Sequence, residues 1–271
     1  MFYSSTMVGD KMKCLEQMIQ NIVEASGPDK IYYRSGLLLI VLPDPSSRPF
    51  CEYKSLIDAS AASSNFHYTF LKAGDLEQLL LNGHLFYSTL CIEDCLVYDG
   101  KTQTLPLPLS QRQKAVAQMA THDYTKGQAR AHAFLRGALF YLGQEELGLA
   151  AFMLHQATEQ ALRAILMSLS GQEVRTHSLT ELKQHVKRYG LPQNTLLLSK
   201  AEEDKYLLDR LEKAYTCARY TDRYEITLED LLQLLTRVKS LLNDLENFFE
   251  ELMDRYLGTS NHPSHTLNRA I

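Results

Sequence analysis

A regular hydrophobic stripe near the C-terminal end places the strongest constraint on the fold. Apolar side chains recur every three or four residues, at Leu228, Leu231, Leu235, Val238, Leu242, Leu245, Phe249, Leu252 and Tyr256. This near-heptad spacing predicts one amphipathic helix of about thirty residues, about 45 Å long at 1.5 Å per residue. Other helices must cover a stripe of that length, so the sequence predicts an antiparallel helical bundle.

Residues 106–258 have helical patterns throughout and no strand signal. Helices are expected over 128–143 and 145–171, each ending at a glycine, and over 178–190 and 202–218. The second of these has a small, apolar face, which lets helices pack closely. Ser178 with Glu181, and Thr227 with Asp230, have the spacing of capping boxes and predict two helix starts.

The first hundred residues have a different, mixed α/β pattern. A helix is expected at 12–25, short strands at 30–33, 37–42, 66–71 and 96–98, and helical pieces over 73–95. The segment 101–110, KTQTLPLPLS, is the predicted linker, because its two prolines favour an extended chain and Ser110 can cap a following helix. The fold class is therefore α+β, with domains at 1–105 and 106–258 and a mobile tail at 259–271.

Composition excludes several classes of protein. The chain is 45% hydrophobic and 22% charged, and its net charge of −4 gives no general attraction to polyanions, so a nucleic-acid contact needs a local basic cluster. Lys183, Lys187 and Arg188 form one short group of this kind. No apolar run is long enough to span a membrane and no signal peptide is evident, so a cytoplasmic protein is expected. The five scattered cysteines suggest reduced thiols, with no metal site.

The C-terminal half resembles the HEPN (higher eukaryotes and prokaryotes nucleotide-binding) domains. The resemblance covers about residues 121–256 and rests on three motifs in order: AAFMLHQATEQALRAIL, then THSLTEL, then an Arg-Tyr junction before the long last helix. It implies an up-and-down helical bundle, a nucleotide or RNA ligand and a homodimer. It also implies that the protein takes part in a toxin–antitoxin-like or regulatory system.

The N-terminal part resembles a reduced nucleotidyltransferase-fold domain, which commonly precedes a HEPN domain. Nucleotidyl transfer needs closely spaced carboxylates to hold Mg²⁺ on the phosphates. Here Arg34, Ser35 and Gly36 stand where the family has carboxylates, and its Gly-Ser loop is missing. Asp44 lies between prolines and is interpreted as a turn residue. The domain is therefore expected to be degenerate, with no metal and no cofactor.

The candidate ligand site is the junction CARYTDRYEI, with Arg219, Tyr220, Arg223 and Tyr224. Arginine binds phosphate bidentately and tyrosine offers a face to a base, which suits a nucleotide or RNA. The alternative is structural: arginines paired with nearby acids and tyrosines packed beneath the junction. On the second helix of the bundle, His155 and Glu159 lie one turn apart, and could line the same cleft or belong to the interior.

HEPN ribonucleases pair an arginine with a histidine across four to six intervening residues, and this motif is degraded. The fifth residue after Arg219 is Tyr224, whose phenol is a poor proton shuttle at neutral pH. Arg255 and His262 have the spacing but lie at a helix end and in the tail. Binding without catalysis is therefore the leading hypothesis, and a ribonuclease using Arg219 with a histidine from elsewhere, such as His155 or one in a partner subunit, is the alternative. A purely structural interaction module is the third.

Overall fold

The computed structural model describes residues 4–44, 49–61, 67–100, 110–190, 202–217 and 224–258. These residues fall in two compact units, one made of 4–83 and 87–100 and the other of 84–86 and 110–258. Within the described ranges, every helix is too short or too polar to span a lipid bilayer. The predicted linker, apart from Ser110, and the tail at 259–271 lie outside the described residues.

The N-terminal unit is built on a four-stranded mixed sheet in the order β3-β2-β1-β4. Its elements are α1 (Ser4–Ser26), β1 (Lys30–Arg34), β2 (Leu37–Leu42), α2 (Phe50–Ala61), β3 (His67–Lys72), α3 (Ala73–Leu81), α4 (Leu85–Leu90), the short 3₁₀ helix η1 (Glu93–Cys95) and β4 (Leu96–Asp99). β1 is antiparallel to β2 and β4, and β3 is parallel to β2. All four strands were expected from the sequence, whereas α2 was not.

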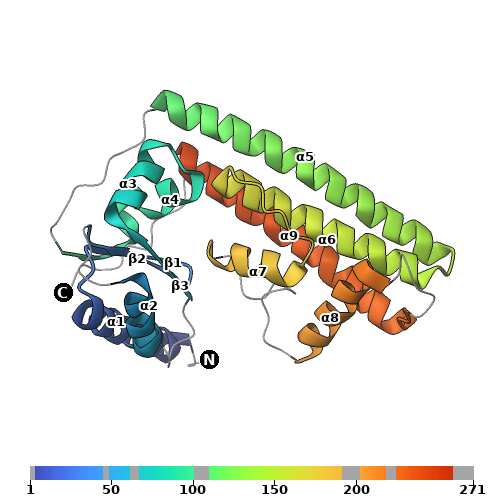
Figure 1. The fold of residues 1–271 in the computed structure, drawn as a ribbon, viewed down its shortest axis with the longest axis horizontal. Coiled ribbons are helices and arrows are strands. Elements are labelled where there is room, and N and C mark those ends of the chain that lie inside the picture. The colour runs from blue at the N-terminus through green and yellow to red at the C-terminus, as the bar shows by residue number, and fades with distance from the viewer. Residues whose placement is uncertain are drawn as a thin grey trace. The chain divides into compact units, whose positions relative to one another are not determined.

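The core of this unit lies between the sheet and the pair α1 and α2, with α3 on the other side of the sheet (Figure 1). Alternate residues of β2 point to the two sides, and all six are buried. Leu38, Ile40 and Leu42 pack against Ile22 of α1 and Ile57 of α2 as part of one buried cluster. The continuous apolar run of β2 therefore reflects a strand covered on both faces.

A two-residue turn joins β1 to β2 where the nucleotidyltransferase pattern would require a longer loop. Arg34 pairs directly with Leu37, and the two turn residues, Ser35 and Gly36, have φ values of 48° and 84°. Positive φ at both positions is the geometry of a type I′ hairpin turn. The Arg34 guanidinium bonds to the carbonyl of Thr89 at 2.8 Å, so this position has a structural use.

The C-terminal unit is a helical bundle, as expected. It comprises α5 (Ser110–Gly143), α6 (Leu147–Ser170), α7 (Leu179–Lys187), α8 (Glu202–Cys217) and α9 (Leu228–Leu257). The helix α6 contacts each of the other four, and Figure 1 shows α5, α6 and α9 running side by side as long rods. The helix α5 begins at Ser110, eighteen residues before the helical pattern recognised at 128.

The caps predicted at Ser178 and Thr227 are confirmed, whereas Ser110 is itself the first residue of α5. The Ser178 hydroxyl accepts a hydrogen bond from the Glu181 amide at 3.3 Å, and the Thr227 hydroxyl accepts from Asp230 at 3.1 Å. Gly171 has a φ of 66° in the left-handed region and ends α6, which glycine does without a Cβ clash. These local signals define where α6, α7 and α9 begin or end.

His84, between α3 and α4, predicts a pH dependence of stability. Burial lowers the pKa of His84 from its ordinary 6.5 to about 4. Between these pH values the unfolded chain binds more protons at this site than the folded chain, so stability falls as pH falls. We expect the free energy of unfolding to drop by about 2 kcal/mol from pH 6.5 to pH 5 because of this group. Urea unfolding of wild type and His84→Gln at both pH values measures it, and an equal drop in both would contradict the assignment.

Candidate functional site

The buried carboxylate of Glu159 organises the polar cluster of the bundle. Only 1% of its side chain is exposed, although it lies in the middle of α6. The Arg163 guanidinium, one turn later, has its Nε 3.3 Å from Glu159 Oε1 and donates from Nη2 to the carbonyl of Thr176 at 2.7 Å. Gln156 also donates to Glu159, at 3.3 Å. A buried carboxylate is stable only when paired in this way, so the cluster is a fixed arrangement.

His177, just before α7, brings a second ring to the same carboxylate. Its Nδ1 lies 3.1 Å and 3.2 Å from the two oxygens of Glu159, and its side chain is 57% exposed. An ionised carboxylate only accepts hydrogen bonds, so Nδ1 is the donor and Nε2 is the ring nitrogen directed away from the carboxylate. His177 was not among the site residues predicted from the sequence.

Tyr215 of α8 lies between two histidine rings. Its ring stacks on His155 with a centroid separation of 4.9 Å and an interplanar angle of 29°, and on His177 with 4.9 Å and 16°. His155 is completely buried, with its Nδ1 3.9 Å from Glu159 Oε2. The structure thus favours the interior role that the sequence left open for His155. Its contribution to any ligand contact is indirect, through Tyr215.

The α8 helix is tied to the start of α7 on the same side of the bundle. Glu212 accepts hydrogen bonds from the Ser178 hydroxyl at 3.1 Å and from the Thr180 amide at 2.8 Å. Together with the Arg163 bond to Thr176, these contacts hold the connection between α6 and α7 in place around His177. His177 is exposed, and Arg163, Tyr215, Gln156 and Glu212 of the same arrangement are each partly exposed.

Of the predicted junction residues, Arg219, Tyr220 and Arg223 lie outside the described residues. Tyr224 is described: its hydroxyl donates to the carbonyl of Arg210 at 3.0 Å, and burial raises the pKa of its phenol. A Cβ on Gly148 would lie 3.7 Å from the Tyr224 ring, which places Tyr224 beside the first turn of α6. This environment matches the packing role that was the alternative for the tyrosines.

The cluster has chemistry suited to an anion and to proton transfer. Arg163 is a fixed cation, one quarter exposed, and His177 has a carboxylate partner that sets its tautomer. Within the described ranges, no group of three or more His, Cys, Asp or Glu side chains could hold a metal ion. The five cysteines, all within the described ranges, form no disulfide bond.

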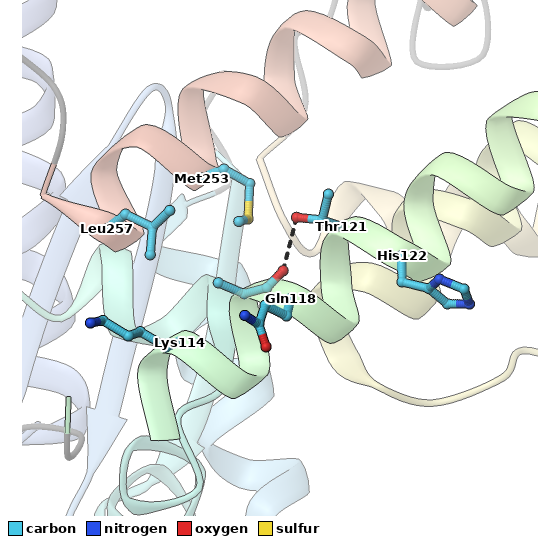
Figure 2. Close-up of a pocket in the computed structure, with 7 residues that line it drawn as sticks. Lys114, Gln118, Thr121, His122, Met253 and Leu257 are labelled. Atoms are coloured by element: carbon cyan, nitrogen blue, oxygen red, sulfur yellow. Dashed lines mark hydrogen bonds between the residues drawn. The ribbon is translucent and has the colours of Figure 1, made fainter. Parts of the chain in front are cut away.

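A separate groove lies between the first half of α5 and the end of α9 (Figure 2). It has a volume of about 520 Å³. Figure 2 shows Met253 and Leu257 of α9 facing α5, from which Lys114 and Gln118 line the opposite side. The Thr121 hydroxyl, also at the groove, donates to the carbonyl of Ala117 at 2.8 Å. None of its lining residues belongs to the Glu159 cluster.

These observations define the class of protein. In the described residues the C-terminal unit is a bundle of five helices, and its central helix, α6, has a buried His-x-x-x-Glu pair. Residues 128–248 match the model of the HEPN domain family, a range that runs from the middle of α5 into the last third of α9. The match supports the HEPN assignment of the helical bundle. No curated protein matches the chain. The nucleotidyltransferase resemblance of the N-terminal part has no such support and stays a hypothesis.

Proposed function

We propose that this protein is a non-catalytic HEPN protein that binds a nucleotide or RNA. The observation that supports the proposal most strongly is the Glu159 cluster, which holds Arg163 and His177 oriented at the surface beside α8. Oriented cationic and hydrogen-bonding groups favour a phosphate. The family match to 128–248 is consistent with nucleotide- or RNA-related function.

Covalent connectivity links this cluster to the Arg-Tyr junction. Tyr215 is four residues before Arg219, and Arg219 is two residues after Cys217, the last residue of α8. The proposed ligand site therefore combines Arg219 and Arg223, as phosphate ligands, with Arg163 and His177. Tyr220 is the proposed stacking residue.

The proposal predicts that a nucleotide stabilises the protein against heat. A ligand at a hundred times its Kd adds about 2.7 kcal/mol, a shift of several degrees for a unit of this size. We expect ATP, GTP, their monophosphates or a short RNA, with or without Mg²⁺, to produce such a shift. Arg219→Ala combined with Arg223→Ala should abolish the shift and leave the unliganded melting temperature unchanged.

The matched control replaces two arginines that pair with neighbouring acids, Arg175 being 86% exposed and Arg255 32% exposed. Arg175 pairs with Glu173 and Arg255 with Glu251, so Arg175→Ala with Arg255→Ala removes the same charge elsewhere. The control should keep the full ligand shift. A shift that survives in the Arg219/Arg223 variant would contradict the proposed site. Absence of any ligand shift, together with lost stability in that variant, would favour the structural interaction module.

One observation favours a metal-independent ribonuclease as the second candidate. The exposed His177 has its Nδ1 held by the buried Glu159, an arrangement that suits a general base acting through Nε2. Arg219 would stabilise the charge on the reacting phosphate. This candidate predicts RNA cleavage in excess EDTA that is lost in both His177→Ala and Arg219→Ala. RNA left intact by wild type would exclude it.

The homodimer, the cytoplasmic location and a role in a toxin–antitoxin-like or regulatory system are parts of the same proposal, because they rest on the family resemblance. Sedimentation velocity of the purified chain tests the dimer directly. A monomer at micromolar concentration would contradict it.

A further inference from the structure

We propose that the outer face of α5 binds the backbone of a single-stranded nucleic acid. This helix concentrates positive charge in a protein whose net charge is −4. Its lysines and arginines are Arg112, Lys114, Lys126, Arg130 and Arg136, whereas its one acid is Asp123. A local basic surface of this kind attracts polyanions even when the whole chain is acidic.

All five cations are exposed; Lys126, Arg130 and Arg136 lie on the side of α5 opposite its buried positions, whereas Lys114 lies at the groove beside α9. Among the residues that the structure describes, Lys114, Lys126, Arg130 and Arg136 form no ion pair with an acid. Some lysines of other helices are paired: Lys54 pairs with Asp58 at 2.7 Å and Lys213 with Asp209 at 2.6 Å, each one turn away. The charge of these four side chains is therefore available to a partner.

The spacing of these residues suits an extended strand. With 3.6 residues per turn, Lys126, Arg136 and Phe140 fall on one side of the helix, and Arg130 lies next to Lys126. Arg112 and Phe140 are 28 positions apart, or about 42 Å along the helix axis at 1.5 Å per residue. The cations themselves extend from Arg112 to Arg136, 24 positions or about 36 Å, with none between Lys114 and Lys126, and this length matches several phosphates of an extended strand.

An exposed aromatic ring ends the basic row. Phe140 is 63% exposed and contacts the Tyr141 ring edge-on, with centroids 5.4 Å apart and an interplanar angle of 76°. Exposure of so large an apolar ring is costly in water. Stacking of an unpaired base on an aromatic ring, next to cations that hold the backbone, is the usual mode of single-strand binding.

Charge and shape distinguish this partner from two others. A second copy of the chain that paired α5 with α5 would place Lys126, Arg130 and Arg136 of both copies in one interface, where like charges repel. A duplex keeps its bases stacked, which leaves Phe140 without a partner. A single strand uses both the cations and the ring, and this surface does not depend on the proposed ligand site at Arg219.

The test measures the binding of a fluorescein-labelled 20-nucleotide oligouridine by fluorescence anisotropy at NaCl concentrations from 50 to 200 mM. The variant Lys126→Gln/Arg130→Gln/Arg136→Gln removes three charges. Because each neutralised phosphate contributes about −0.7 to the slope of log K against log salt for a single strand, the slope should become shallower by about 2. We also expect an affinity loss of at least about tenfold at 50 mM NaCl. Phe140→Ala should weaken binding about fivefold or more with the slope unchanged.

The control is Lys205→Gln/Lys213→Gln/Lys239→Gln, which removes the same charge from exposed positions of α8 and α9. It should bind RNA like wild type. Equal losses in the two triple variants, or a wild type that does not bind, would overturn the proposal. So would salt-sensitive self-association that only the α5 variant loses, with no RNA binding by wild type, because the face would then bind protein.

The experiments test the α5 surface and the proposed ligand site independently. The substituted side chains of the α5 and control variants are exposed, and equal melting temperatures check that each variant folds. The α5 variant should keep the thermal shift with a mononucleotide, and the Arg219/Arg223 variant should keep the salt slope that the α5 cations produce. If wild type shows only the thermal shift or only the salt-dependent RNA binding, the missing result identifies which of the two proposed surfaces is wrong.

Discussion

Gly127→Val is expected to destabilise the bundle by about 3 kcal/mol, because this glycine sets the distance between α5 and α6. A Cβ at position 127 would lie 2.4 Å from the Cβ of Ala164 and 3.1 Å from its Cα. These atoms cannot rotate away as a long side chain can, so the two helices would have to separate. Gly127→Ala meets the same contact, and we expect it to destabilise as well, despite the better helix propensity of alanine.

Gly137 on the same helix provides the matched control. The nearest atoms to a Cβ there are Sδ of Met153 at 3.3 Å and Cγ at 3.5 Å, and a methionine side chain adapts easily. Gly137→Ala should therefore be neutral or stabilise by up to about 1 kcal/mol. Urea unfolding of both alanine variants measures the difference. If Gly127→Ala proved as stable as Gly137→Ala, the close α5–α6 packing would be wrong.

The regular helices could be predicted because their signals are local. The α9 helix has large apolar residues at helical spacing and a threonine cap at Thr227, and the structure agrees within two residues at both ends. The first half of α5 was harder. Its buried positions include Ala117 and Ala120, which bury little apolar area and so give a weak hydrophobic pattern. The α2 helix also buries few large side chains, such as Tyr53 and Ile57, so its hydrophobic pattern is weak too.

The candidate site could be predicted only in part, because it combines residues from distant segments. His155 and Glu159 share a face of α6, and helical spacing alone indicates that. Arg163 continues this face by one turn, a signal that was present and missed. His177 and Tyr215 are 18 and 56 positions beyond Glu159, on a connection and on another helix. Nothing in local spacing indicates that they return to the same carboxylate.

Glu159→Ala is the second large effect we expect, with a loss of about 3 kcal/mol in the free energy of unfolding. The carboxylate is 1% exposed, so its removal leaves a cavity and deprives Arg163 and His177 of their shared partner. Both partners are partly exposed and can regain water, which keeps the loss near the low end of the range for buried pairs. Urea unfolding at pH 7 measures it.

Glu173→Ala is the control for the Glu159 prediction, because it removes an exposed carboxylate whose Arg175 partner is 86% exposed, and should cost less than about 0.5 kcal/mol. Similar losses in the two variants would show that Glu159 does not organise the cluster.

His177→Ala separates structure from function: its side chain is more than half exposed, so the fold should lose little stability. If the cluster contributes to the ligand site, the same variant should reduce the nucleotide-induced thermal shift. An unchanged shift would restrict the role of His177 to holding the connection between α6 and α7.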